Sequence, residues 1–123
     1  MKKQSMRTDV NVEKNLAPLL DRSHLDTQTF GDADLAREVL SLFEGQCHRL
    51  LPALAEEGRS AEERADLAHT LKGAALGVGA MRVAEASATV ETGLRKAGEA
   101  DLGALRNAVA QTLDALASFG LEA

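Results

Sequence analysis

The sequence predicts an all-α protein, an antiparallel four-helix bundle with a short N-terminal extension or leading helix. Apolar residues recur at spacings of three and four in several long segments, as on the buried face of an amphipathic helix. No segment shows the strict apolar and polar alternation of a strand. Aromatic residues make up only 2% of the chain, so Leu, Ala and Val must supply the core, and these residues suit closely packed helices.

Length, charge and cysteine content limit the possible functions. The chain has 123 residues, enough for one domain with a core of its own. Its net charge of −5 and pI of about 5.2 argue against the basic surface that a nucleic-acid binder needs. No apolar run approaches the roughly 18 residues of a membrane span, and no apolar stretch follows the charged N-terminus. Because Cys47 has no second cysteine to pair with, we predict a cytoplasmic protein.

The predicted bundle domain covers residues 25–123, and residues 1–24 form a separate N-terminal tail. The tail is polar apart from a short apolar patch at residues 16–20, so we expect it to fray or to form a short leading helix. No chemistry is visible in the tail. The functional residues are therefore expected in the bundle.

The first long helix is predicted to begin near Gly31 and Asp32, because an acidic side chain at a helix start meets free backbone N–H groups. It should run to about Glu57. Pro52 lacks a backbone donor, so the last turns should kink or break there. The apolar stripe of this helix consists of Ala36, Leu40, Phe43, Cys47, Leu50 and Leu54.

Three further helices follow. Ser60 and Glu63 have the spacing of a capping box, so the second helix should start at Ser60 and run to about Leu76, before Gly77 and Gly79. The third should span about 80–96 and the fourth about 102–119. Their predicted buried residues are Val83, Ser87, Val90 and Leu94 in the third helix, and Leu102, Leu105, Val109, Leu113 and Leu116 in the fourth.

The second helix contains the most informative segment. At roughly 100° per residue, with Leu67 taken as zero, three further apolar residues fall within about 40° of Leu67 and predict the buried face together with it. The four residues are Leu67, Leu71, Ala74 and Val78. His69 falls at about 200°, opposite this face. Its predicted neighbours on the outer face are Glu62, Ala65, Asp66, Lys72, Gly73 and Leu76.

The outer face around His69 is unusual for a solvated surface. Gly73 lies mid-helix, where Gly costs about 1 kcal/mol relative to Ala, and it leaves an approach to the imidazole open. Lys72 is within reach of an anion on the ring, and Ala65 and Leu76 add apolar surface. These features are typical of a docking site. An ordinary surface histidine remains the alternative on geometry alone.

Residues 69–73, His-Thr-Leu-Lys-Gly, resemble the H-x-x-K-G signature of histidine-containing phosphotransfer (HPt) domains of bacterial two-component phosphorelays. The preceding apolar helix, the turn at residues 78–80, and Val90-Glu91 also fall where that family has similar residues, so the resemblance covers roughly residues 25–119. Ala74 and Ala75 depart from the serines that often follow the motif glycine. Both are small, so packing is kept and a hydroxyl contact is lost.

The resemblance implies a role for each residue of the motif. His69 would carry the phosphoryl group on Nε2, Lys72 would stabilise its charge, and Gly73 would give clearance. Glu91 would orient the ring by a hydrogen bond, with a solvated surface residue as the alternative. The protein would be a phosphoryl carrier without kinase activity and would need no metal or cofactor of its own, because the Mg²⁺ lies on the partner.

The implied partners are receiver domains of hybrid histidine kinases and response regulators. Ala65, Asp66 and Leu76, with surface residues of the helix at 32–57, are the predicted docking patch. We expect a monomer, because no separate heptad seam is apparent. The alternative function is a helical interaction module that binds a response regulator without carrying phosphate.

Two other histidines and the cysteine were considered as metal ligands. Cys47 and His48 are adjacent and point in different directions on a helix. We therefore predict that Cys47 is a core residue, His48 a solvated residue and His24 a loop residue.

Overall fold

The computed structural model describes residues 18–118, and within them every regular element is a helix. This confirms the predicted all-α class. The helices are α2 (Arg22–Gln28), α3 (Ala33–Leu54), α4 (Ala61–Val78), α5 (Met81–Ala97) and α6 (Gly103–Ala117). None of these helices is both long and apolar enough to cross a membrane.

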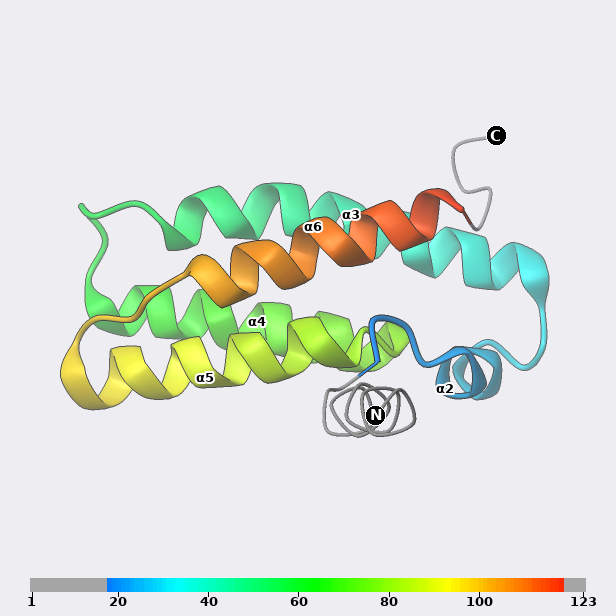
Figure 1. The fold of residues 1–123 in the computed structure, drawn as a ribbon, viewed down its shortest axis with the longest axis horizontal. Coiled ribbons are helices and arrows are strands. Elements are labelled where there is room, and N and C mark those ends of the chain that lie inside the picture. Colours follow the sequence, from blue (N-terminus) through cyan, green and yellow to red (C-terminus); the bar gives the residue numbers. More distant parts are fainter. Residues whose placement is uncertain (1–17, 119–123) are drawn as a thin grey trace, which may run out of the picture.

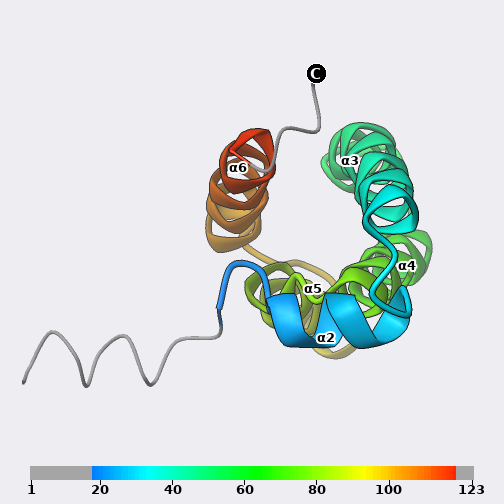
Figure 2. The same cartoon turned by 90° about the vertical axis from the view of Figure 1, so that its right-hand side faces the viewer.

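The four long helices form an antiparallel bundle. Helices α3 and α6 make one layer, α4 and α5 make the other, and consecutive helices run in opposite directions (Figure 1). The end-on view shows α2 lying across one end of the α4 and α5 layer (Figure 2). The most extensive packing joins α4 to α5, followed by α3 to α4. Helices α4 and α5 are therefore the most closely packed pair in the bundle.

The helix starts are where the sequence predicts them. Asp32 caps α3 by accepting hydrogen bonds from the backbone N–H groups of Asp34 and Leu35. Ser60 and Glu63 form the predicted capping box of α4, each side chain accepting from the other residue's backbone N–H. Helix α4 ends at Gly79, whose φ of 84° lies in the left-handed region that glycine tolerates.

The first long helix ends earlier than predicted. Helix α3 stops at Leu54, two residues after Pro52, whereas the prediction extended it to about Glu57. Pro52 has no backbone N–H, so the last turn lacks one of the hydrogen bonds that would hold it to the preceding turn. The predicted stripe is in place, with Leu40, Phe43, Cys47 and Leu54 buried and Ala36 and Leu50 partly buried.

The buried face of α4 is turned from its predicted position. Leu71 and Val78 are buried as predicted, but Leu67 and Ala74 are only partly buried. The observed face consists of Ala65, Ala68, Leu71, Ala75 and Val78. At 100° per residue this is a rotation of roughly 70° toward His69. His69 therefore lies at the border of the core face and not opposite it.

The structure around α2 differs from the prediction in one respect. Residues 1–17, where the tail was predicted, lie outside the described residues, while α2 spans the predicted boundary between residues 24 and 25. His24 was predicted as a loop residue, but it lies in α2. Its Nε2 is 2.7 Å from the carbonyl oxygen of Leu76, so the ring attaches α2 to the end of α4.

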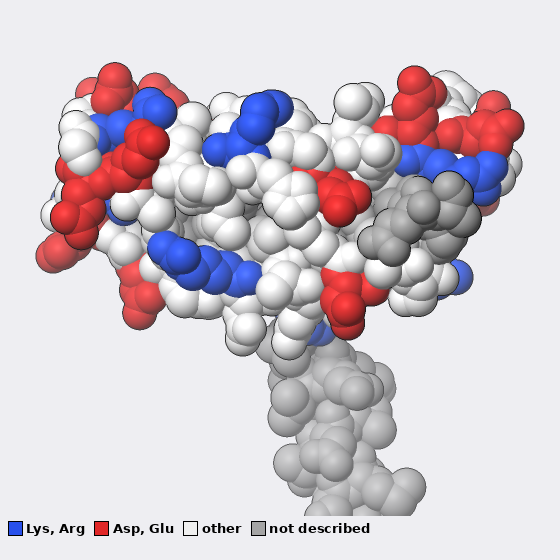
Figure 3. Space-filling view, turned by 90° about the horizontal axis from the view of Figure 1, so that it is seen from above, with Lys and Arg blue, Asp and Glu red and all other residues white. Residues whose placement is uncertain are grey.

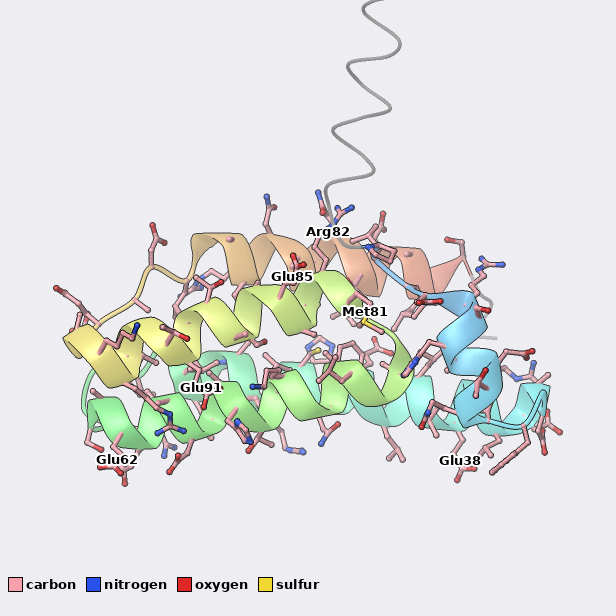
Figure 4. The ribbon with its side chains drawn as sticks, turned by 90° about the horizontal axis from the view of Figure 1, so that it is seen from below. Glu38, Glu62, Met81, Arg82, Glu85 and Glu91 are labelled. Atoms are coloured by element: carbon pink, nitrogen blue, oxygen red, sulfur yellow. The ribbon has the colours of Figure 1, made fainter. Side chains whose placement is uncertain are left out.

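The two broad faces of the bundle differ in their charges. On the face formed by α3 and α6, charged side chains gather at the two ends and the middle is mostly uncharged (Figure 3). The opposite face, formed by α4 and α5, has Glu91 between its two helices (Figure 4). The residues around Glu91 form the candidate site.

Candidate functional site

His69 lies on α4 with its ring open to solvent and one ring nitrogen held by α5. Its side chain is 61% exposed. Nδ1 lies 3.2 Å from both carboxylate oxygens of Glu91, which is on α5 and only 15% exposed. The close packing of α4 on α5 brings these two residues together although they are far apart in the sequence.

The contact with Glu91 selects the tautomer of the neutral ring. An ionised carboxylate can only accept hydrogen bonds, so the Nδ1 that faces it must carry the proton and donate it. In the neutral ring Nε2 is then left unprotonated with a lone pair. The arrangement presents a nucleophilic nitrogen on an exposed side chain.

Lys72 is the cation of the sequence motif. It lies one turn after His69 on α4, and its Nζ is 3.5 Å from Glu91 Oε1. The side chain is 31% exposed. Since Lys72 and His69 share a carboxylate, the ammonium group lies beside the imidazole, as the sequence spacing predicts.

Two further charged residues join the site. Arg95, one turn after Glu91 on α5, donates from Nε to Glu91 Oε2 at 3.0 Å, and its Nη2 lies 3.0 Å from the same oxygen in an ion pair. Its Nη2 also donates to Asp66 Oδ1 on α4 at 3.0 Å. Sequence reasoning missed Arg95. The available signal was the favourable spacing of a Glu four residues before an Arg on one helix.

These contacts change the acid–base properties of Glu91 and Arg95. Partial burial raises the pKa of the Glu91 carboxyl, but the hydrogen bonds from Arg95 and His69 and the positive charge of Lys72 outweigh it, so the pKa is lowered overall. Asp66 and then Glu91 raise the pKa of the Arg95 guanidinium. Glu91 is therefore ionised at neutral pH, as the assignment of the ring proton requires.

Gly73 is exposed, one turn beyond His69. A Cβ atom added there would meet nothing within 4 Å. An alanine methyl group would therefore not touch the His69 ring within the protein itself. Any clearance that Gly73 provides concerns a molecule that approaches the ring from outside.

The three predicted docking residues differ in their exposure to solvent. Leu76 is 45% exposed, as expected for a docking residue. Ala65 is fully buried, so the prediction that its side chain adds surface apolar area was wrong. The rotation of the α4 face explains the error, because it turns Ala65 toward the core. Asp66 is exposed, and its carboxylate pairs with Arg95.

The other residues considered as metal ligands lie apart from this site. Cys47 is buried in α3, and burial raises the pKa of its thiol to about 12, which makes it an inert core residue. His48 is exposed beside Glu44, with Nε2 3.8 Å from Oε2. Among residues 18–118, no group of three His, Cys, Asp or Glu side chains is arranged to hold a metal ion.

A comparison with known protein families agrees with the sequence motif. The family model described as "Hpt domain" matches residues 38–119, more than half of the chain. The match includes the whole charged cluster from Asp66 to Arg95. Searches of curated proteins and of solved structures found no match.

Proposed function

Because the chain belongs to the Hpt domain family, which has a histidine phosphotransfer role in phosphorelays, we propose that His69 is the residue that carries the phosphoryl group. One observation supports this choice most directly. Glu91 accepts from Nδ1 of an exposed ring, so Nε2 is the free nucleophile. The other histidines of the chain are His24, which faces a backbone carbonyl, and His48, which lies beside Glu44.

We propose that His69 exchanges the phosphoryl group with aspartates of receiver domains. Nε2 attacks the phosphorus of an aspartyl phosphate, a P–N bond forms, and the P–O bond to the aspartate breaks with its electron pair leaving on the carboxylate. The phosphorylated imidazole keeps its Nδ1–H donated to Glu91. Reversal of these steps on a second receiver passes the group onward.

Lys72 and Gly73 assist this exchange from one side of the ring. The ammonium group of Lys72 offsets part of the charge that the phosphoryl group brings. Gly73 leaves space for the partner's active-site surface. The Mg²⁺ and the remaining charge stabilisation come from the receiver, and the protein contributes no cofactor of its own. It acts as a carrier without kinase activity.

We propose that the receiver docks on exposed apolar residues of α4 and α3. Leu76 is 45% exposed on α4 and Leu42 is 65% exposed on α3, within the helix where the docking patch was predicted. Asp66 borders the same region of α4. We propose that a monomer in the cytoplasm performs this exchange, since the lone Cys47 is buried and forms no disulfide.

Label transfer from a phosphorylated receiver domain tests the proposal. The wild-type protein and His69→Gln are incubated with the receiver and Mg²⁺, and the label on each is followed. We expect acid-labile, base-stable label on the wild type alone. Equal labelling of H69Q would place the phosphoryl group elsewhere. Absence of transfer from several receivers, together with binding to one of them, would favour an interaction module that carries no phosphate.

A further inference from the structure

Glu91 is the centre of a chain of ion pairs that joins α4 to α5. Asp66 on α4 pairs with Arg95 on α5, Arg95 pairs with Glu91, and Glu91 pairs with Lys72 back on α4. Beside the ring of His69, the side chains of Asp66, Arg95, Glu91 and Lys72 carry alternating charges that sum to zero. A resemblance to the H-x-x-K-G motif does not account for Asp66 or Arg95.

Arg95 and Lys72 contact different oxygens of the Glu91 carboxylate. Its guanidinium occupies Oε2 through two nitrogens at 3.0 Å, whereas Lys72 lies 3.5 Å from Oε1. Arginine presents its donors in a fixed planar fork, so the hydrogen bond from Nε together with the close ion pair of Nη2 restricts where the carboxylate can turn. Asp66 restrains the guanidinium from the other helix, so Arg95 is held at both ends.

Building on the proposed phosphotransfer function, we propose that Arg95, restrained by Asp66, is a positioning residue that holds Glu91 against His69 Nδ1. This position keeps the proton on Nδ1 and leaves Nε2 free. The hydrogen bonds and ion pairs of Arg95 go to Glu91 and Asp66 and not to the ring. Arg95 acts through Glu91 alone.

Arg95 also allows Lys72 to leave the Glu91 carboxylate and to pair with the phosphoryl group. Without Arg95, Lys72 would be the one cation of this cluster left on the Glu91 carboxylate, and their attraction would keep the ammonium group there. With Arg95 present, Glu91 stays neutralised when Lys72 turns to an arriving phosphoryl group. The carboxylate then repels the phosphoryl group less.

The test compares Arg95→Met with wild type in the receiver assay, using Arg106→Met on the exposed surface of α6 as the matched control. We expect R95M to slow phosphoryl uptake by about fivefold, and R106M to leave it unchanged, since fivefold corresponds to about 1 kcal/mol of barrier. In a Glu91→Gln background R95M should add less than about twofold, because its effect passes through the carboxylate. Additive losses in the double variant would overturn the proposal.

A spectroscopic measurement separates positioning from a structural role. Nitrogen-15 NMR of the His69 ring reports which nitrogen carries the proton in the neutral form. We expect the wild type and R106M to hold the proton on Nδ1, and R95M to show a mixture of the two tautomers. Arg95→Lys should restore only part of the preference, because an ammonium group lacks the planar fork. An unchanged tautomer in R95M would contradict the proposal.

The NMR measurement also distinguishes this inference from the proposed function. If no receiver phosphorylates the wild type but R95M changes the tautomer, the phosphotransfer function fails and the positioning role stands. If the wild type takes up label and R95M matches it in both rate and tautomer, the function stands and the role of Arg95 fails.

Discussion

At the scale of single residues, we expect Gly73 to lower the stability of the fold and to favour phosphoryl transfer. A glycine in the middle of a helix costs about 1 kcal/mol relative to alanine. Space inside the protein does not explain its presence, since an added Cβ would meet no atom within 4 Å. We propose that the approach of a partner to His69 explains this glycine.

Gly73→Ala should therefore stabilise the fold and impair its function. We expect the free energy of unfolding to rise by about 1 kcal/mol and phosphoryl uptake to slow by about tenfold, because the added methyl group displaces the partner from in-line geometry. Denaturant unfolding and label transfer measure the two effects. Asn107→Ala, at an exposed site on α6 outside the predicted docking patch, should give a stability gain alone. Unchanged transfer in G73A would remove the clearance role.

The lowered pKa of Glu91 predicts a pH-dependent contribution to stability. A carboxyl whose folded pKa is lowered stabilises the protein above its ordinary pKa of 4.5, and this stability is lost as the pH falls through the folded value. At pH 7, Glu91→Gln should lower the free energy of unfolding by up to about 1 kcal/mol, since the cluster is partly exposed. The deficit should shrink below pH 4.5. Denaturation at pH 7 and pH 3 tests this, and equal deficits would contradict it.

Leu76 allows a test of docking without a change in the core. Its side chain is 45% exposed, so Leu76→Asp should leave thermal unfolding nearly unchanged. If the receiver buries this residue, the charge should weaken transfer by about tenfold or more at low receiver concentration. Saturation with receiver should recover most of the rate. A variant with wild-type transfer at every concentration would exclude Leu76 from the docking patch.

At the scale of helices, sequence patterns predicted the start and the left-handed end of α4 better than its buried face. The capping box at Ser60 and the left-handed Gly79 follow from local chemistry that the sequence displays directly. The buried face of α4 does not, because the helix contains five alanines and little hydrophobic contrast. Alanine fits both a surface and a closely packed interface, so only the position of α5 decides which alanines are buried.

The same limitation applies to the site. His69, Lys72 and Gly73 lie within one helical turn and were visible in the sequence. Glu91 was identified only through the family resemblance. Arg95 and Asp66 meet across α4 and α5, so their pairing depends on how one helix is rotated against the other. The rotation of α4 is the feature that the sequence predicted incorrectly.

Helices α5 and α6 each bury a hydroxyl group that lacks a partner. Ser87 and Thr112 are fully buried, and neither side-chain oxygen has a hydrogen bond in the structure. A buried polar group without a partner costs about 1–3 kcal/mol in lost solvation. The packing of α5 and α6 in the bundle is therefore less stable than it would be with apolar groups of the same shape at these two positions.

Thr112→Val should consequently stabilise the protein. The change replaces the hydroxyl with a methyl group, and we expect the free energy of unfolding to rise by about 1 kcal/mol. Thr89→Val is the control, because Thr89 is exposed and its hydroxyl donates to the carbonyl of Glu85. It should change stability by less than about 0.5 kcal/mol. Destabilisation in T112V would indicate that the hydroxyl has a partner, such as a bound water.

At the scale of the whole molecule, the segment before α3 is attached to the turn between α4 and α5. The backbone N–H of Asp21 donates to the carbonyl of Gly79 at 2.7 Å, and that of Arg82 donates to the carbonyl of Pro18 at 3.1 Å. The second bond satisfies a donor at the start of α5, where no side chain caps the helix. Residues before the predicted domain boundary thus complete the bundle.

Two glycines allow the strength of this attachment to be measured. Gly79 and Gly98 both end a helix with a left-handed φ, 84° and 79°. A Cβ on Gly98 would meet nothing within 4 Å, whereas a Cβ on Gly79 would lie 2.7 Å from the carbonyl oxygen of Asp21. The two positions therefore share the same backbone strain and differ in the contact with the N-terminal segment.

Gly98→Ala should cost about 1–2 kcal/mol of unfolding free energy, the penalty of a left-handed alanine. Gly79→Ala should cost about 2–4 kcal/mol, because the N-terminal segment must also move away. Hydrogen exchange locates the difference: the Arg82 amide should lose protection in G79A and keep it in G98A, since Pro18 accepts from that amide. Equal losses of stability with an equally protected Arg82 amide would mean that the segment yields at no cost and contributes little to the fold.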